Sequence, residues 1–220
     1  FRYTSLISIQ AAAEQSQTMG VKYTVISIDD IYDAFSKSLS NEFAGLDEDT
    51  TEENLQARCR GTILMSISNK KGLLVLTTGN KTEIAVGYST LYGDMAGGFD
   101  VLKDVPKMLV YSLCRYRNLR GDCIPDIVLK RPPSAELSPD QRDEDSLPPY
   151  KILDEILALY VENDESAEEI ISKGYRAEYV NQTVELVDKN EYKRRQAPIG
   201  VRISRRGFGR DRRYPITCSW

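Results

Sequence analysis

One short apolar run most constrains the fold of this 220-residue chain. Residues 73–76, with the sequence LLVL, are continuously apolar, as is typical of a strand buried on both faces of a parallel sheet. At 77–80 (TTGN), hydroxyl, glycine and amide groups replace the branched hydrocarbons. Ligands of open α/β sheets bind beyond the carboxyl ends of the strands. The sequence therefore predicts a ligand site here, followed by a helix that is capped near Asn80 and carries Glu83 in its first turn.

The remaining segments alternate between helical and strand-like patterns. Residues 21–28 are β-rich and predict a second strand. Thr50 and Glu53 form a capping-box pattern at the start of a long helix. The other helical patterns are 4–19, 31–44, 51–69, 106–117, 150–163, 167–173 and 176–192. This alternation predicts an α/β fold with an open, mostly parallel sheet flanked by helices and a helical C-terminal part.

Three stretches are too polar to belong to a core. Residues 88–98 contain three glycines, which permit a close approach of the backbone to a ligand. Residues 132–149 combine prolines with charges and predict a long, ligand-associated loop. Residues 193–213 are strongly basic, and we interpret 193–220 as a tail of the same domain. We expect its arginines to face solvent or another subunit, notably Arg194, Arg195, Arg205 and Arg206.

Composition excludes several functions. The chain has no histidine, so it cannot by itself form a Ser-His-Asp or Cys-His hydrolase or a histidine-ligated zinc site. Its four cysteines show no metal-site spacing, and we expect reduced thiols in a cytoplasmic protein. The net charge of −4 and the scarcity of aromatics in the basic tail argue against nucleic-acid binding. No apolar run approaches the roughly 20 residues of a membrane span, and no signal peptide is visible.

Four motifs resemble those of one enzyme family. TTGNKTEIAVGYSTLYGDMAGGF at 77–99, followed by VPK, is similar to the signature of the synthetase domain of glutamine-dependent NAD synthetases. PPSAEL at 132–137, QRDEDSLPPY at 141–150 and NEYKRRQAP at 190–198 extend the resemblance. It implies the adenine nucleotide alpha hydrolase-like (ATP pyrophosphatase) fold and the amidation of deamido-NAD to NAD. In that reaction ATP adenylates the nicotinate carboxylate, pyrophosphate leaves, and ammonia displaces AMP.

The resemblance also implies partners and site residues. ATP and Mg²⁺ would be the cofactors, ammonia would come from a glutaminase domain, and the protein would form a dimer or a larger homo-oligomer. The positions that match ATP contacts are Thr78, Lys107 and Ser134. The positions that match deamido-NAD contacts are Asn54, Arg58, Glu83, Tyr88, Ser89, Thr90, Leu91 and Lys193. Glu83 also matches the ligand of Mg²⁺, a hard cation that prefers oxygen.

The chain departs from the family at its start. The pyrophosphate-binding loop SGGxDS does not occur, and residues 1–5 resemble the segment that follows the family's second strand. We therefore expect an incomplete synthetase domain that belongs to a longer enzyme and catalyses little by itself. Two alternatives stay open. One is another ATP pyrophosphatase, such as a GMP or asparagine synthetase relative; the other is a non-catalytic nucleotide-binding or assembly module.

Overall fold

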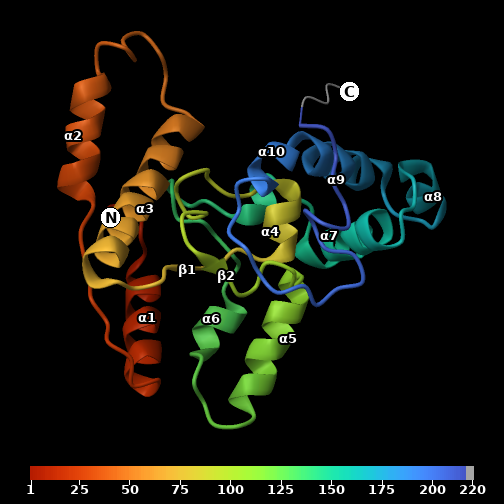
Figure 1. Ribbon diagram of the computed structural model, residues 1–220, viewed down its shortest axis with the longest axis horizontal. Coiled ribbons are helices and arrows are strands. Elements are labelled where there is room, and N and C mark those ends of the chain that lie inside the picture. The colour runs from red at the N-terminus through yellow and green to blue at the C-terminus, as the bar shows by residue number, and fades with distance from the viewer. Residues whose placement is uncertain (217–220) are drawn as a thin grey trace.

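The computed structural model describes residues 1–216. Three helices lie on one side of a short central sheet, and a helical C-terminal part lies on the other (Figure 1). The helices are α1 (Leu6–Thr18), α2 (Asp29–Leu39), α3 (Thr50–Lys71), α4 (Lys81–Val86), α5 (Lys107–Asn118), α6 (Asp126–Lys130), α7 (Tyr150–Leu157), α8 (Ala167–Ser172), α9 (Ala177–Lys189) and α10 (Glu191–Arg194). The remaining elements are β1 (Leu76–Thr77), β2 (Phe99–Asp100), the 3₁₀ turn η1 (Asp143–Asp145) and the π-helical segment η2 (Ala158–Glu162).

The sheet confirms the α/β class and the parallel pairing. β1 pairs with β2 in a register that sets Leu76 opposite Phe99 and Thr77 opposite Asp100. The expectation of a strand buried on both faces is wrong, because Leu74 is 65% exposed and Leu76 is 55% exposed. These side chains project from the faces of the sheet, and within the described residues those faces stay largely open to solvent.

Residues 21–28 do not form the predicted strand. They connect α1 and α2 without regular secondary structure, and Val25 remains 69% exposed. A β-rich segment becomes a strand only when a neighbouring strand supplies hydrogen bonds and side-chain contacts. The part of the chain that the structure describes offers none to this segment.

The start of α3 corrects a second expectation. Its N-cap is Asp49, whose carboxylate accepts a hydrogen bond from the Thr51 amide at 2.6 Å. Glu52 reaches back to accept from the Asp49 amide at 2.8 Å. The capping box therefore lies one residue before the predicted Thr50–Glu53 pair. An N-cap residue needs extended backbone angles, and Asp49 has them with φ −144° and ψ −156°.

The largest hydrophobic core lies in the C-terminal half and holds α4 in place. Apolar residues of α4, α7, α8, α9 and η2 pack there, and the ribbon shows α4, α7, α8 and α9 in this half of the molecule (Figure 1). Its buried members are Ala85, Val86, Leu147, Tyr150, Leu153, Ile156, Leu157, Tyr160, Val161, Ile170, Val180 and Val187. Because α4 carries Glu83, this core fixes one wall of the site described below.

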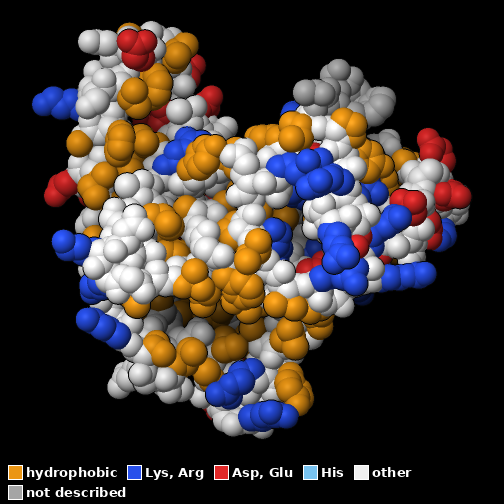
Figure 2. Space-filling view, viewed as in Figure 1, with side chains coloured by type: hydrophobic (Ala, Val, Ile, Leu, Met, Phe, Trp, Pro, Cys, Tyr) orange, Lys and Arg blue, Asp and Glu red, His pale blue; other side chains and the backbone are white. Residues whose placement is uncertain are grey.

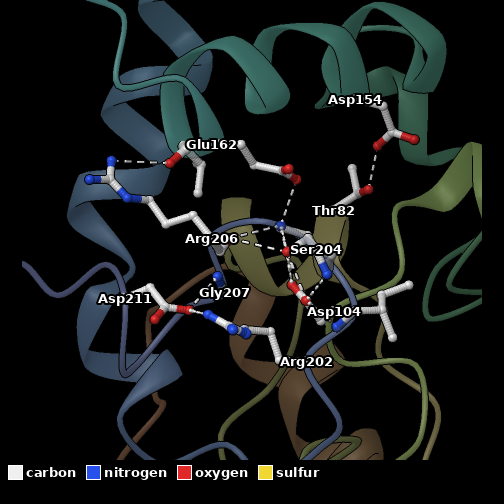
Figure 3. Close-up of polar contacts among 12 residues, drawn as sticks. Thr82, Asp104, Asp154, Glu162, Arg202, Ser204, Arg206, Gly207 and Asp211 are labelled. Carbon is white, nitrogen blue, oxygen red and sulfur yellow. Dashed lines mark hydrogen bonds and ion pairs between the residues drawn. The ribbon is translucent and has the colours of Figure 1, made fainter.

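The C-terminal segment, residues 197–216, returns to the central sheet. The Asp100 amide donates to the Ile199 carbonyl at 2.8 Å. Farther along, the Asp104 carboxylate accepts from the Ser204 amide at 2.7 Å and from its hydroxyl (Figure 3). Residues 217–220 of the predicted tail lie outside the described range, and so does Cys218. The three cysteines within it, Cys59, Cys114 and Cys123, are free thiols, as expected.

The basic tail is only partly a surface feature. Lys and Arg side chains gather over the part of the molecule that contains α9, α10 and the C-terminal segment (Figure 2). Arg195 and Arg205 are exposed, as expected. Arg194 is buried instead and donates to the Ala85 carbonyl at 2.6 Å. Its charge is balanced by Glu191 at 3.0 Å, which explains how an arginine is accommodated in the core. No helix within residues 1–216 has the length and apolarity to cross a membrane.

Candidate active site

A cavity of about 890 Å³ opens where β1 ends. Its walls come from α3, α4, the segment after α4, the first residue of α5, the 132–149 loop and α10. The volume falls in the range of about 300–1,000 Å³ that is usual for small-molecule and cofactor sites. Nine of the predicted site residues line it: Asn54, Thr78, Glu83, Tyr88, Ser89, Thr90, Lys107, Ser134 and Lys193.

The first turn of α4 places Glu83 at the cavity. Asn80 caps the helix, as predicted, and accepts from the Glu83 amide at 3.0 Å. The Glu83 carboxylate in turn accepts from the Asn80 amide at 3.3 Å. The other carboxylate oxygen lies 2.7 Å from the Lys107 amino group. Burial by itself would lower the pKa of Lys107, but the charge of Glu83 and the hydrogen bond outweigh it and raise the pKa. Lys107 therefore stays cationic.

The first turn of α5 is held by side chains from other helices. Pro106 precedes this helix and offers no side-chain cap. The Lys107 amide instead donates to the Thr82 hydroxyl at 2.9 Å, and the Met108 amide donates to Asp154 at 2.8 Å. Thr82 in turn donates to Asp154 (Figure 3). These bonds satisfy orphan amides and fix the helix that carries Lys107 relative to α4.

The segment after α4 is fastened from two sides. Lys193 of α10 donates to the carbonyls of Gly87 and Ser89 at 2.7 and 2.8 Å. On the α3 side, the Thr90 hydroxyl donates to Asn54 at 2.7 Å. Lys193 is thus the residue that joins the distant NEYKRRQAP motif to the cavity, and burial lowers the pKa of its amino group.

Two tyrosines share one buried carboxylate in the wall. Asp143 accepts from the Tyr88 hydroxyl at 3.0 Å and from the Tyr150 hydroxyl at 2.7 Å. The Lys107 amino group lies 4.9 Å from the centre of the Tyr150 ring. Burial, reinforced by Asp143, raises the pKa of both tyrosines, so both stay protonated at neutral pH.

Two of the predicted site residues, Arg58 and Leu91, are not part of the cavity lining. The Arg58 guanidinium donates to the Leu91 carbonyl at 3.2 Å, a contact that ties α3 to the segment after α4. Their roles in binding deamido-NAD stay predictions.

The structure also brings in residues that sequence reasoning missed. Arg60, Asp143, Gln141, Glu53 and Glu136 line the cavity. Arg60 lies on the same helix as Asn54, and Asp143 and Gln141 belong to the QRDEDSLPPY motif, so the motifs pointed to these segments without singling out these side chains.

Comparison with known proteins identifies the family. The family model for NAD synthase matches residues 2–197. The chain belongs to the NAD synthase family. It is 56% identical over 222 residues to the glutamine-dependent NAD(+) synthetase of Acinetobacter baylyi and 53% identical over 217 residues to that of Thermotoga maritima. These alignments cover 100% and 98% of this chain but 41% and 38% of the two relatives.

Solved structures of NAD synthetases have the same fold. The glutamine-dependent NAD+ synthetase of Acinetobacter baumannii in complex with ADP is 50% identical, with a TM-score of 0.59 over 97% of this chain and 38% of that one. That of Cytophaga hutchinsonii is 22% identical, a likeness that shows the fold alone, with a TM-score of 0.79 over 96% and 37%. The family and fold expected from the motifs are confirmed. The chain spans about 40% of the length of the curated relatives above.

Proposed function

We propose that this chain forms the synthetase part of an enzyme that amidates deamido-NAD to NAD. ATP would activate the nicotinate carboxylate as an acyl-adenylate, releasing pyrophosphate, and ammonia from a glutaminase domain would then displace AMP. One observation carries the proposal: side chains from position 54 to position 193 converge on one cavity of about 890 Å³. They include a carboxylate, lysines and hydroxyl groups, which can bind a metal ion and phosphate oxygens, and no step of the reaction requires histidine. The adenine nucleotide seen in the Acinetobacter baumannii relative also supports it.

Lys107 and Thr78 are the groups proposed to hold ATP. An ammonium group has three donors, and Glu83 uses one from Lys107, so two remain for phosphate oxygens. The Thr78 hydroxyl lies at the carboxyl end of β1, and Ser134 lines the cavity from the 132–149 loop. Such donors stabilise the charge that develops on the phosphates as the carboxylate attacks.

Glu83 is the residue proposed to hold Mg²⁺. Within residues 1–216 no group of three or more carboxylate or thiol side chains could bind a metal ion by itself. One carboxylate nevertheless fits Mg²⁺, which usually takes one or two carboxylates together with substrate phosphates and water. When bound, the ion would neutralise phosphate charge and polarise the reacting phosphoryl group.

The segment 87–91 is proposed to hold deamido-NAD. Lys193 uses two of its donors on the Gly87 and Ser89 carbonyls and retains one for the substrate. This arrangement would orient the carboxylate toward ATP, which converts a bimolecular encounter into a positioned reaction. The cytoplasmic location and the assembly into a dimer or larger oligomer are further proposals that rest on the motif resemblance.

Pyrophosphate–ATP exchange tests the proposal. The complete polypeptide that contains this chain, given ATP and Mg²⁺, should exchange only when deamido-NAD is present. Lys107→Met should reduce the exchange about 10²–10³-fold, the usual effect of losing one donor to a developing charge. The matched control is Lys130→Met, since Lys130 is a solvent-exposed lysine of α6. Exchange that depends on xanthosine monophosphate or aspartate would point to another ATP pyrophosphatase. Nucleotide binding without exchange would point to a non-catalytic module.

A further inference from the structure

One buried hydroxyl group lies between the helices that carry Glu83 and Lys107. Thr82 precedes Glu83 in the first turn of α4 and is 0% exposed. Its hydroxyl accepts a hydrogen bond from the Lys107 amide at 2.9 Å. The same hydroxyl donates to Asp154 of α7 (Figure 3). Thr82 is not part of the cavity lining, so it can act on a bound substrate only through the residues that it holds.

The first turn of α5 depends on polar contacts because the helix itself is loosely packed. None of the twelve residues of α5 is buried, and its far end extends away from the hydrophobic core (Figure 1). Pro106 has no amide hydrogen, so Lys107 and Met108 supply the first donors of the helix. Side chains bind both amides, that of Lys107 through Thr82 and that of Met108 through Asp154. A bridge of two side chains therefore sets the position of Lys107.

Other hydrogen bonds fix the segment 87–91, which is proposed to hold deamido-NAD. Lys193 donates to two carbonyl groups of this segment. The Thr90 hydroxyl donates to Asn54 of α3. None of these hydrogen bonds involves Thr82. The part of the site proposed for ATP and the part proposed for deamido-NAD are therefore held by separate sets of contacts.

We propose that Thr82 is a positioning residue for the ATP-dependent step, because its hydroxyl fixes α5 with Lys107 against α4 with Glu83; this rests on the proposed function. Glu83 accepts from the Lys107 amino group at 2.7 Å, and the two are the groups proposed to hold Mg²⁺ and phosphate. Such groups stabilise a transition state only when they are held where the charge develops. A misplacement of about 1 Å can slow a reaction about 100-fold. Without the Thr82 hydroxyl, the Lys107 amide loses its acceptor and the first turn of α5 can move relative to α4.

Pyrophosphate–ATP exchange by the complete polypeptide, with deamido-NAD present, tests this role. Thr82→Val keeps the shape of the side chain but removes the hydroxyl, and it should lower kcat of exchange about 10- to 100-fold. KM for deamido-NAD should stay at the wild-type value, since the segment 87–91 keeps its own hydrogen bonds. Thr82→Ser retains a hydroxyl and should keep kcat near the wild-type value.

Thr183→Val is the matched control. Thr183 of α9 is also 0% exposed, and its hydroxyl donates to the Tyr179 carbonyl at 2.7 Å. It is not part of the cavity lining. The substitution makes the same chemical change at the same degree of burial, so it should leave kcat and the KM values of both substrates unchanged.

Amide hydrogen exchange measures the movement of α5 without any substrate. Thr82→Val should speed the exchange of the Lys107 and Met108 amides about 5- to 10-fold, the effect of losing one hydrogen bond. Thr82→Ser and Thr183→Val should leave the exchange of these two amides at the wild-type rate.

A wild-type kcat in Thr82→Val would overturn the positioning role. So would equal losses of kcat in Thr82→Val and Thr183→Val, or a rise in KM for deamido-NAD as large as the fall in kcat, because either result would indicate a general loss of structure. If Thr82→Val does not fold, Asp154→Asn carries the same test, since its NH2 group replaces one of the two oxygens that accept from Thr82 and the Met108 amide. Absence of pyrophosphate–ATP exchange in the wild type would instead refute the proposed function.

Discussion

Replacing Lys81 by methionine should destabilise the protein more than any loss of a surface charge. Lys81 begins α4 and is 4% exposed. Its amino group lies 3.1 Å from Asp104 and 2.8 Å from Glu162. It also donates to the Ser204 hydroxyl at 2.6 Å and to the Arg206 carbonyl at 3.0 Å. One cation therefore joins α4, the segment before α5, η2 and the C-terminal segment, and Figure 3 shows the partners converging.

The size of the loss in the free energy of unfolding depends on the groups that Lys81→Met leaves without a partner. Removing one member of a buried ion pair typically costs about 3–5 kcal/mol because its partner stays buried without compensation. Asp104 keeps its hydrogen bonds from Ile203 and Ser204, and the side chain of Glu162 is 22% exposed and can turn to water. We therefore expect the lower end, a loss of about 3 kcal/mol in the free energy of unfolding. For a chain of this size that shifts the urea midpoint by about 1 M.

Lowering the pH should reduce the difference in the free energy of unfolding between the wild type and Lys81→Met. Burial acts to raise the pKa of Asp104, but hydrogen bonds from Ser204 and Ile203 and the charge of Lys81 outweigh it, so the pKa lies below the usual value. A lowered carboxyl pKa contributes stability above its unfolded value, and that contribution is lost as the pH falls through the folded value. The difference between wild type and Lys81→Met should therefore be full at pH 7 and decline below about pH 4.

Urea unfolding followed by circular dichroism measures this difference. Lys130→Met serves as the control, because Lys130 forms an exposed pair with Asp126 four residues away, worth about 0.5 kcal/mol at most. A Lys81→Met variant within about 0.5 kcal/mol of the wild type would refute the reasoning. So would a difference that does not change between pH 7 and pH 3.

Two further predictions concern the cavity wall. Burial, reinforced by the shared carboxylate of Asp143, raises the pKa of Tyr88 and Tyr150. In an absorbance titration both tyrosines should therefore stay protonated until the protein unfolds, and the free energy of unfolding should fall as the pH rises above about 10. Ionisation of every tyrosine near pH 10 without unfolding would contradict this. Gly87→Ala should destabilise the fold far more than Gly20→Ala, and it should raise KM for deamido-NAD. Both glycines have positive φ, but a Cβ at Gly87 would lie 2.1 Å from the Asn190 side chain, whereas a Cβ at Gly20 would meet nothing within 4 Å. Equal destabilisation of the two variants in urea would contradict the packing argument.

Local signals predicted local structure well. The cap at Asn80 and the place of Glu83 in the first turn of α4 were both predicted, because the residues that form a cap lie within four positions of one another. The capping box of α3 was placed one residue too late, since Asp49 competes with Thr50 for the same role and only backbone angles decide between them.

Strand expectations failed for the opposite reason. Residues 21–28 have β-rich composition, yet a strand exists only through its neighbours, and the described residues provide none there. The apolar run at 73–76 was correctly placed next to a cavity, but its burial was overestimated because burial depends on what covers both faces.

The sequence by itself determined the family, the α/β class and nine of the residues around the cavity, because long motifs encode them directly. Tertiary structure alone decided that Asp143 accepts hydrogen bonds from two tyrosines and that Asp154 accepts one from the first turn of α5, at a residue 46 positions away. The physical reason is that hydrogen bonds and electrostatic interactions act over a few ångströms in space. Which side chains come that close is set by the packing of α4 against α5, α7 and α9, and no spacing along the chain records it.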